Sequence, residues 1–278
     1  MLTIDVLMPA ASDGYAPLAA EALAGYRDAF ARQGVTIAPR PWDAGPGDGA
    51  ATLALFAWGY HLDVMRWEAM LDAWPSDRLL FNPADLLRWN TCKTYLQALE
   101  AKSIAIVPSL FCDADAASVA AAFAHFDTDQ LVIKPQVSGG SYRTERLRPG
   151  MPVTPLPDAI IQPFLPAVVE EGELSQLFID GEFSHAVCKV ATGGDFRIQP
   201  QFGGQLSAVN PDAEARALAD RVIAALPQIP LYARVDLIRL ADGSLALMEL
   251  EAIEPDLYTD HCPQVRDRLA SAVVQRLR

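Results

Sequence analysis

The sequence contains few cysteines and no long apolar runs, and it is short of basic residues relative to acidic ones. Its cysteines, Cys92, Cys112, Cys188 and Cys262, are scattered and form no C-x-x-C pair, which argues against a disulfide framework and a zinc site. No apolar run approaches membrane-spanning length, and the start M-L-T-I-D-V-L-M-P is too acidic and too interrupted for a signal peptide. We therefore expect a soluble, cytoplasmic protein with reduced thiols.

The excess of acidic residues limits the range of partners. A formal net charge of −13 and a pI near 4.7 argue against nucleic acid or an anionic membrane, since both require a basic surface. Any polyphosphate ligand must then be bound by cations gathered locally. With 278 residues and no internal repeat, the chain can form one large domain or two to three closely packed smaller ones.

The first third of the chain has the pattern of a small parallel α/β domain, because short apolar strands alternate with segments of helical periodicity. The predicted elements are strands at 4–8 and 35–37, a helix at 16–32, a strand at 52–57, a helix at 62–73 and a strand at 79–81.

The remainder changes to an α+β pattern, in which hairpin-forming strands outnumber helices. A long helix is predicted at 83–101. Further strands are predicted at 131–134, 159–163, 175–180, 183–190, 233–240 and 245–251, and further helices at 114–126, 211–225 and 263–277.

The most informative segment is A-R-V-D-L-I-R-L-A-D-G-S-L-A-L-M-E-L-E, in which Asp-Gly at 242–243 predicts a two-residue turn between two apolar strands. Such a turn pairs Asp236 with Glu249 and Arg234 with Glu251. Because side chains alternate along a strand, all four would project from one face of the hairpin. An odd-length loop would shift this register, but it would leave Glu249 and Glu251 on the same face.

Carboxylates at this spacing repel one another unless a cation lies between them. A hard divalent ion such as Mg²⁺, shared with substrate phosphates, would relieve the repulsion. The alternative is an edge hairpin whose acids face water. The leucines that surround the acids favour strands packed within a core, and therefore favour the metal site.

Two lysines end predicted strands. Lys134, in L-V-I-K-P, precedes the small-residue loop Q-V-S-G-G-S-Y, where Gly139, Gly140 and Ser141 would let backbone N–H groups approach phosphate oxygens. Lys189 ends the strand S-H-A-V-C-K-V. The alternative for each is a lysine that simply extends into solvent.

Two further cations and one uncharged segment are also candidates for binding a polyphosphate ligand. Lys93 lies on the predicted helix, where most lysines are merely solvated. Arg197 lies between two glycine pairs, which suggests a loop over an anion, although an ion pair with Asp195 is the alternative. The segment I-I-Q-P-F-L-P could present backbone groups to an adenine edge, or it could be a plain linker.

Taken together, Lys93, Lys134, the S-G-G-S loop, Q-P-F-L, Lys189 and R-V-D with E-L-E resemble the ATP-grasp superfamily, especially its glutathione-synthetase-like and D-alanine–D-alanine-ligase-like members. The resemblance extends from about Asn82 to the C-terminus. It implies an α/β domain at 1–82, a central lid subdomain with a linker helix at 83–165, and a C-terminal subdomain with the metal site at 166–278. A nucleotide would lie between two antiparallel sheets.

The resemblance also implies roles for individual residues. Glu251 departs from the family pattern, which usually has asparagine there, so the number of magnesium ions is left open. The metal would be held by Asp236, Glu249 and Glu251. ATP would contact Lys93, Lys134, Gly139, Gly140, Ser141, Gln162, Pro163, Phe164, Leu165 and Lys189, and Arg234 and Lys189 would be catalytic. Apart from the resemblance, Arg197 is a third catalytic candidate and is expected to bind a substrate carboxylate.

Within the superfamily, N-P-A-D-L-L-R-W-N-T-C-K-T-Y-L and Y-A-R-V-D with M-E-L-E-A-I-E-P resemble a bacterial group that includes the D-cycloserine-forming cyclo-ligase, which acts on O-ureido-D-serine. The expected activity is ATP- and Mg²⁺-dependent joining of a carboxylate to an amine on a small amino-acid-like substrate, through an acyl phosphate. The alternatives are a nucleotide-binding protein without ligase activity and a metal-dependent hydrolase. Related ligases are often homodimers, but no segment indicates an interface.

Substrate recognition is expected at the carboxyl ends of the N-terminal strands, where ligands of open α/β sheets bind. The candidates are Asp13, Tyr15, Trp58, Tyr60 and His61. By contrast, His185 on its strand is interpreted as a packed histidine.

Overall fold

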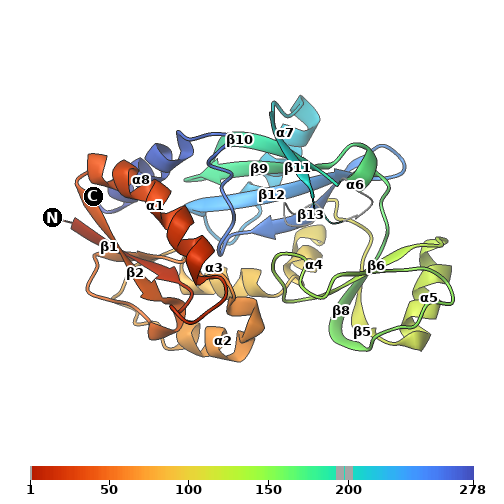
Figure 1. Ribbon diagram of the computed structural model, residues 1–278. Coiled ribbons are helices and arrows are strands. Elements are labelled where there is room, and N and C mark those ends of the chain that lie inside the picture. Colours follow the sequence, from red (N-terminus) through yellow and green to blue (C-terminus); the bar gives the residue numbers. More distant parts are fainter. Residues whose placement is uncertain (1, 192–196, 198–202) are drawn as a thin grey trace.

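The computed structural model describes residues 2–191, 197 and 203–278. Over these residues the strands form three sheets, which fall one after another along the chain (Figure 1). The predicted division at 82/83 and 165/166 is compatible with this succession and remains a prediction. Among the described helices, none is long and apolar enough to cross a membrane.

The first sheet is parallel and has the strand order β2-β1-β3-β4. Its long helix lies where the apolar periodicity predicts it, with buried Leu23, Tyr26 and Phe30 on one face. The elements are β1 (Leu2–Met8), α1 (Ala16–Arg32), β2 (Val35–Pro41), β3 (Ala51–Leu53), α2 (Val64–Asp72) and β4 (Leu80–Phe81), with 3₁₀ turns at Trp42–Ala44 and Tyr60–Leu62.

The single helix predicted at 83–101 is wrong. Two helices, α3 (Ala84–Thr91) and α4 (Tyr95–Glu100), are separated by an extended Cys92 with φ −101° and ψ 127°. At the break, the backbone N–H of Lys93 donates to the carbonyl of Gln136, 2.8 Å away, instead of continuing the helical ladder. The break carries no proline or glycine, so a tertiary contact overrides helical periodicity here.

The second sheet is antiparallel, with the order β5-β8-β6-β7, and α5 (Ala116–Phe126) packs on it. A capping box at Asp115 and Ser118 starts this helix. In Figure 1 the sheet and its helix project from the rest of the molecule. The strands are β5 (Leu110–Ala114), β6 (Leu131–Pro135), β7 (Glu145–Leu147) and β8 (Leu156–Pro163).

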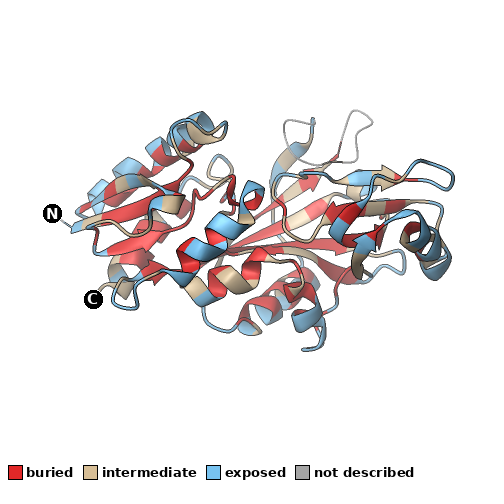
Figure 2. Cartoon of the chain, turned by 90° about the horizontal axis from the view of Figure 1, so that it is seen from below, coloured by how far each residue is buried: buried red, intermediate tan, exposed pale blue. Residues whose placement is uncertain are grey.

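The third sheet is antiparallel, with the order β11-β10-β9-β12-β13, and its central strands are almost wholly buried (Figure 2). The buried face of α7 packs against β12 and β13, while α8 returns to pack on α1 beside the first sheet. The elements are α6 (Ala167–Glu170), β9 (Glu173–Ile179), β10 (Glu182–Val190), β11 (Gln205–Val209), α7 (Ala213–Ala224), β12 (Tyr232–Arg239), β13 (Leu245–Glu251) and α8 (Val265–Arg276).

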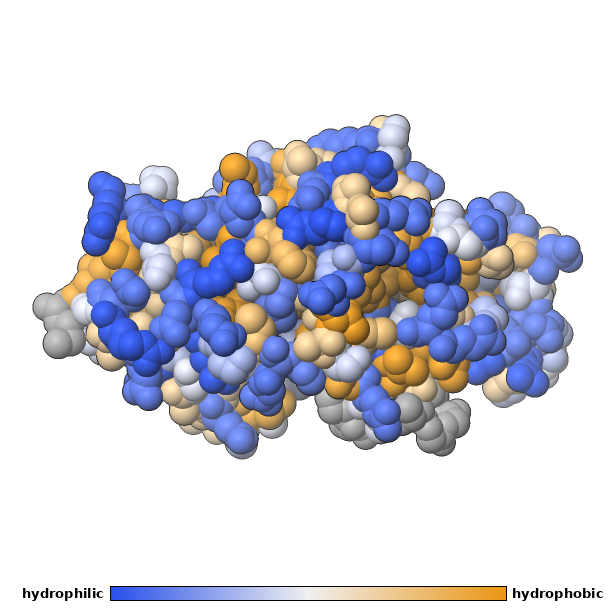
Figure 3. Space-filling model, turned by 90° about the horizontal axis from the view of Figure 1, so that it is seen from above, coloured by the Kyte–Doolittle hydropathy of each residue, from blue (hydrophilic) through white to orange (hydrophobic). Residues whose placement is uncertain are grey.

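One face of the molecule shows how hydrophilic and hydrophobic side chains are distributed over the surface. On the face drawn in Figure 3, hydrophilic side chains predominate and hydrophobic ones show through in separate groups. The four cysteines are free and partly buried, as the scattered spacing predicts.

Asn82 connects the first sheet to the third. Its side chain is fully buried; Nδ2 donates to the carbonyls of Tyr232 and Ala252, both at 2.8 Å, and Oδ1 accepts from the N–H of Leu231 at 2.7 Å. Its φ of +55° also lies in the left-handed region, which asparagine tolerates better than alanine.

We expect Asn82→Ala to lower the free energy of unfolding by about 2–4 kcal/mol, because it leaves buried backbone groups unpaired. Urea denaturation followed by tryptophan fluorescence would measure the change. The exposed Asn210→Ala is the matched control and should leave the midpoint unchanged. Equal midpoints for both variants would contradict the role assigned to Asn82.

Candidate active site

The β12–β13 hairpin places its acids as predicted, although its turn differs from the prediction. Asp236 lies opposite Glu249, and Arg234 lies opposite Glu251. The loop, however, has three residues instead of two, because the N–H of Leu240 donates to the carbonyl of Ser244 at 2.8 Å. Gly243 closes this loop with φ +86°, the left-handed geometry typical of a three-residue hairpin.

A β-bulge compensates for the longer loop. Leu237 pairs with Leu247, whereas the preceding Asp236 pairs with Glu249, so Met248 is the extra residue. The bulge turns both Met248 and Glu249 towards the cleft between the second and third sheets. It therefore restores the register of the acids that the odd-length loop would have shifted.

Asp236, Glu249 and Glu251 form a compact group. One carboxylate oxygen from each lies within 4.8 Å of the others. Neighbouring cations compensate their charge: Arg234 bonds to Asp236 at 3.0 Å and to Glu251 at 2.5 Å, and Lys93 Nζ lies 3.2 Å from Glu249. Asp236 is buried and the side chains of Glu249 and Glu251 are each 25% exposed, so the acids are less open to water than the edge-hairpin alternative supposes.

Asp236 is 1% exposed, and burial disfavours its charge. Arg234 and Lys189, together with a hydrogen bond from Ser175, outweigh burial and hold its pKa at about 2. Burial beside Glu249 and Asp236 instead raises the pKa of Glu251 to about 7, although Arg234 opposes the rise.

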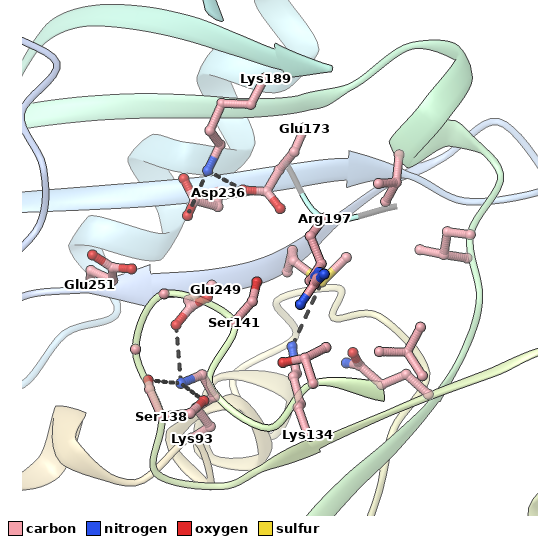
Figure 4. Close-up of a pocket in the computed structure, with 18 of the residues that line it drawn as sticks. Lys93, Lys134, Ser138, Ser141, Glu173, Lys189, Arg197, Asp236, Glu249 and Glu251 are labelled. Carbon is pink, nitrogen blue, oxygen red and sulfur yellow. Dashed lines mark hydrogen bonds and ion pairs between the residues drawn. The ribbon is translucent and has the colours of Figure 1, made fainter. Parts of the chain in front are cut away.

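Lys189 projects from β10 into the same group. Its strand partner Glu173 forms an ion pair with it, and Asp236 Oδ2 lies 3.4 Å from its Nζ (Figure 4). Burial raises the pKa of Glu173 to about 7, against the opposing effect of Lys189. Lys189 is 6% exposed, so the alternative of a solvent-facing lysine is wrong.

Lys93 and Lys134 approach the acids from the opposite side of the cleft (Figure 4). The helix break at Cys92 directs Lys93 inward, where its Nζ donates to the carbonyl of Ser138 at 2.7 Å and to its hydroxyl at 3.1 Å. Lys134, at the end of β6, is 8% exposed, and burial lowers its pKa. Both lysines are buried, so neither is the solvated surface lysine of the alternative interpretations.

The small-residue loop closes one side of the cleft. Gly139, Gly140 and Ser141 line it, and positive φ angles of 58° at Gly140 and 62° at Ser141 make the turn. Arg197 also lines the cleft, whereas Asp195, its alternative ion-pair partner, lies outside the described residues.

The segment from Gln162 to Leu165 forms the far end of the cleft. Gln162 Nε2 donates to the Ser109 hydroxyl at 2.8 Å, and the backbone N–H of Phe164 donates to the carbonyl of Gln130 at 2.9 Å. The Arg146 guanidinium lies 3.6 Å from the centre of the Phe164 ring. The structure therefore brings all the predicted site residues to one cleft, while their individual roles remain predictions.

Only some of the residues predicted to recognise substrate line a pocket beside the cleft. Tyr15, Trp58 and His61 line a second pocket beside the cleft, whereas Tyr60 is buried behind them and Asp13 caps the backbone N–H of Tyr15. His185 is bonded to Ser184 and to the Leu257 carbonyl, as expected for a packed histidine.

Sequence reasoning missed Glu173 and Met248 in the cleft, Ser175 as the buried hydrogen-bond donor to Asp236, and Glu254 and Tyr258 in the second pocket. The polar residues of E-L-S-Q-L, spaced by two in a buried strand, were the available signal for Glu173 and Ser175. For Glu254 and Tyr258, which follow β13 in an irregular segment, periodicity offers no signal.

No family model matches the chain. A curated relative, the cycloserine biosynthesis protein DcsG of Streptomyces lavendulae, is 29% identical over 72% of this chain and 74% of its own length. The crystal structure of D-cycloserine synthetase DcsG superposes with a TM-score of 0.85 at 24% identity, covering 99% of this chain and 100% of that one.

More distant structures share the fold. D-alanine–D-alanine ligase from Bacillus anthracis has a TM-score of 0.69 at 13% identity, covering 100% of this chain and 97% of that one. The ATP-grasp ligase PsnB, complexed with a minimal precursor, has a TM-score of 0.68 at 17% identity, covering 99% and 100%. Together with the sequence likeness above, these superpositions show that the chain has the fold of the ATP-grasp ligases.

Proposed function

We propose that the chain uses ATP and Mg²⁺ to activate a carboxylate of a small amino-acid-like substrate as an acyl phosphate, and then forms an amide or cyclic amide with release of ADP and phosphate. The observation that carries the proposal is the arrangement of charge. A compact group of acids on the third sheet faces two buried lysines across a single cleft, Lys134 on the second sheet and Lys93 at the break between α3 and α4.

The acids fit a magnesium ion. They offer hard oxygen ligands from both strands of the hairpin, and their oxygens lie close enough for modest side-chain rotations to gather them around one ion. When bound, Mg²⁺ would neutralise phosphate charge and fix the orientation of the transferring group. Glu251 adds a negative charge beside Arg234, and the number of ions remains open.

The cations would then exchange partners. Lys93, Lys189 and Arg234 are now paired with acids, and a metal–triphosphate complex supplies both a cation for those acids and anionic oxygens for the freed side chains. The adenine would lie along the segment from Gln162 to Leu165, between the two antiparallel sheets. The ligand thus enters without leaving a buried charge unpaired.

In the chemical step, a substrate carboxylate attacks the γ-phosphorus and ADP leaves. The positive charges of Lys134, Lys189 and Arg234 offset the charge that develops on the transferring phosphoryl group. An amine then attacks the acyl carbon, and phosphate leaves with the electron pair of the broken C–O bond. The loop at 138–143 would exclude water, which otherwise hydrolyses the acyl phosphate.

A screen for ADP release tests the proposal. The panel holds amino acids of both configurations with ureido and aminooxy amino acids, alone and in pairs, with hydroxylamine added in parallel to trap an acyl phosphate as a hydroxamate. We expect at least one acid to stimulate Mg²⁺-dependent ADP release and hydroxamate formation. Substrate turnover without ATP would favour a metal-dependent hydrolase, and ATP binding without ADP release under any combination would favour a nucleotide sensor.

A further inference from the structure

A second pocket, which we call the side pocket, adjoins the cleft, and the role inferred for it rests on the proposed function. Its walls come from parts of the chain that are distant in sequence. Tyr15, Trp58 and His61 come from the first α/β unit, and Glu254 and Tyr258 from the segment after β13. Lys189, Arg234 and Glu251 line both the side pocket and the cleft, so the two spaces meet at these residues.

Glu254 brings a carboxyl group to the side pocket without a counter-ion. It forms no ion pair with any residue that the structure describes, and Trp58 Nε1 donates only to its backbone carbonyl, at 3.2 Å. Burial, reinforced by the nearby charge of Glu251, raises the pKa of the Glu254 carboxyl well above its usual range. A cationic group entering the pocket would remove this penalty, because it would give the ionised carboxylate a partner.

His61 provides a second, independent sign of a missing ligand. The side chain is 7% exposed, and neither ring nitrogen has a hydrogen-bond partner among the described residues. Burial, assisted by Lys93, lowers the pKa of His61 to about 4, so the ring is neutral at pH 7 and offers an acceptor nitrogen. Leaving a buried polar group of this kind unpartnered is unfavourable, and a hydrogen-bonding ligand would remove that cost.

The opposite end of the side pocket carries two cations, Arg234 and Lys189, which a bound metal would release from their acid partners. Arg234 and Lys189 lie over the same Tyr258 ring, with their charged groups 5.6 Å and 5.9 Å from its centre. Tyr258 is held with φ +45°, and its backbone N–H donates to Asp256 at 2.8 Å. This end faces the cleft in which the phosphoryl group would be transferred, so it suits the carboxylate that is to be activated.

We propose that the side pocket binds a small amino acid, with its ammonium group at Glu254 beside His61 and its carboxylate at Arg234 and Lys189. The arrangement of charge in the pocket argues against three other simple classes of ligand. A dicarboxylate would place an anion against Glu254, and a diamine would place a cation against Arg234. An acid without an amino group would leave Glu254 without a partner.

Two acids test the inference: the panel acid that gives the most ADP, and its analogue with a hydroxyl group in place of the α-amine. Hydroxylamine-trapped ADP release is measured for both. We expect the wild type to prefer the amino acid by about 10–100-fold in kcat/KM, the range of a charge-assisted contact. In Glu254→Gln this preference should fall below about 3-fold, with KM for ATP unchanged within about 2-fold.

Controls separate recognition from damage to the fold. Glu100→Gln, at an exposed position of α4, should behave as wild type, and Glu254→Asp should retain part of the preference. Equal use of both acids by the wild type, or an undiminished preference in Glu254→Gln, would overturn the inference and leave the ligase activity standing. A parallel rise in KM for ATP would reassign Glu254 to the nucleotide site. If no acid stimulates ADP release, the proposed function fails first and the inference fails with it.

Discussion

Replacing Asp236 with asparagine is expected to reduce Mg²⁺-dependent ADP release by about 10²–10³-fold, because metal stabilisation of phosphoryl charge contributes several kcal/mol. Asp236 contributes one of the clustered oxygens, and an amide in its place also leaves Arg234 and Lys189 without their shared anion. The Mg²⁺ concentration that gives half-maximal rate should rise as well. Initial rates over a Mg²⁺ series measure both effects.

Asp242→Asn is a matched control on the same hairpin, since Asp242 lies exposed in the loop. It should leave the rate and the Mg²⁺ dependence unchanged. Thermal unfolding of both variants separates loss of metal from loss of fold. If the Asp236→Asn enzyme keeps the wild-type rate and Mg²⁺ dependence, the acids do not bind the metal.

Replacing Lys134 with methionine is expected to lower kcat/KM for ATP by about 10²–10³-fold, the usual effect of removing one group that stabilises transition-state charge. The same change should leave stability equal or raised. Lys134 is buried with its Nζ 3.9 Å from the Met248 sulfur, and no acid among the described residues forms an ion pair with it. An apolar side chain of similar length removes the desolvation penalty. We therefore expect Lys134→Met to lower activity without lowering stability.

Lys102→Met, at an exposed position outside the cleft, provides the comparison for activity and should leave ADP release unchanged. ADP release measures the activity, and urea denaturation measures the stability. A metal-dependent hydrolase that used the carboxylates alone would be indifferent to Lys134→Met, so unchanged turnover in this variant would favour that alternative over the ligase.

The part of the site that sequence could predict is the part governed by strand alternation. Glu249 and Glu251 share a face whatever the register, and the pairing of Asp236 with Glu249 followed from the position of the turn. That pairing is confirmed for a reason that the sequence did not show. The loop is one residue longer than predicted, and the bulge at Met248 offsets it.

The rest depended on contacts between distant segments. Lys93 points into the cleft because the helix breaks at Cys92, and that break depends on a hydrogen bond to Gln136. Glu254 enters the side pocket from a segment without regular periodicity. Local propensity reports neither the contact between distant residues that orients Lys93 nor the position of Glu254 in the side pocket.

The packing of α8 on α1 has a consequence for biosynthesis. Leu269, Ala270 and Val273 belong to the same apolar core as Leu23 and Tyr26. Domains commonly fold in order as they leave the ribosome, from the N-terminal end. Here the first α/β unit lacks part of its interior until α8 has been translated, so its core can be completed only after both antiparallel sheets have been synthesised.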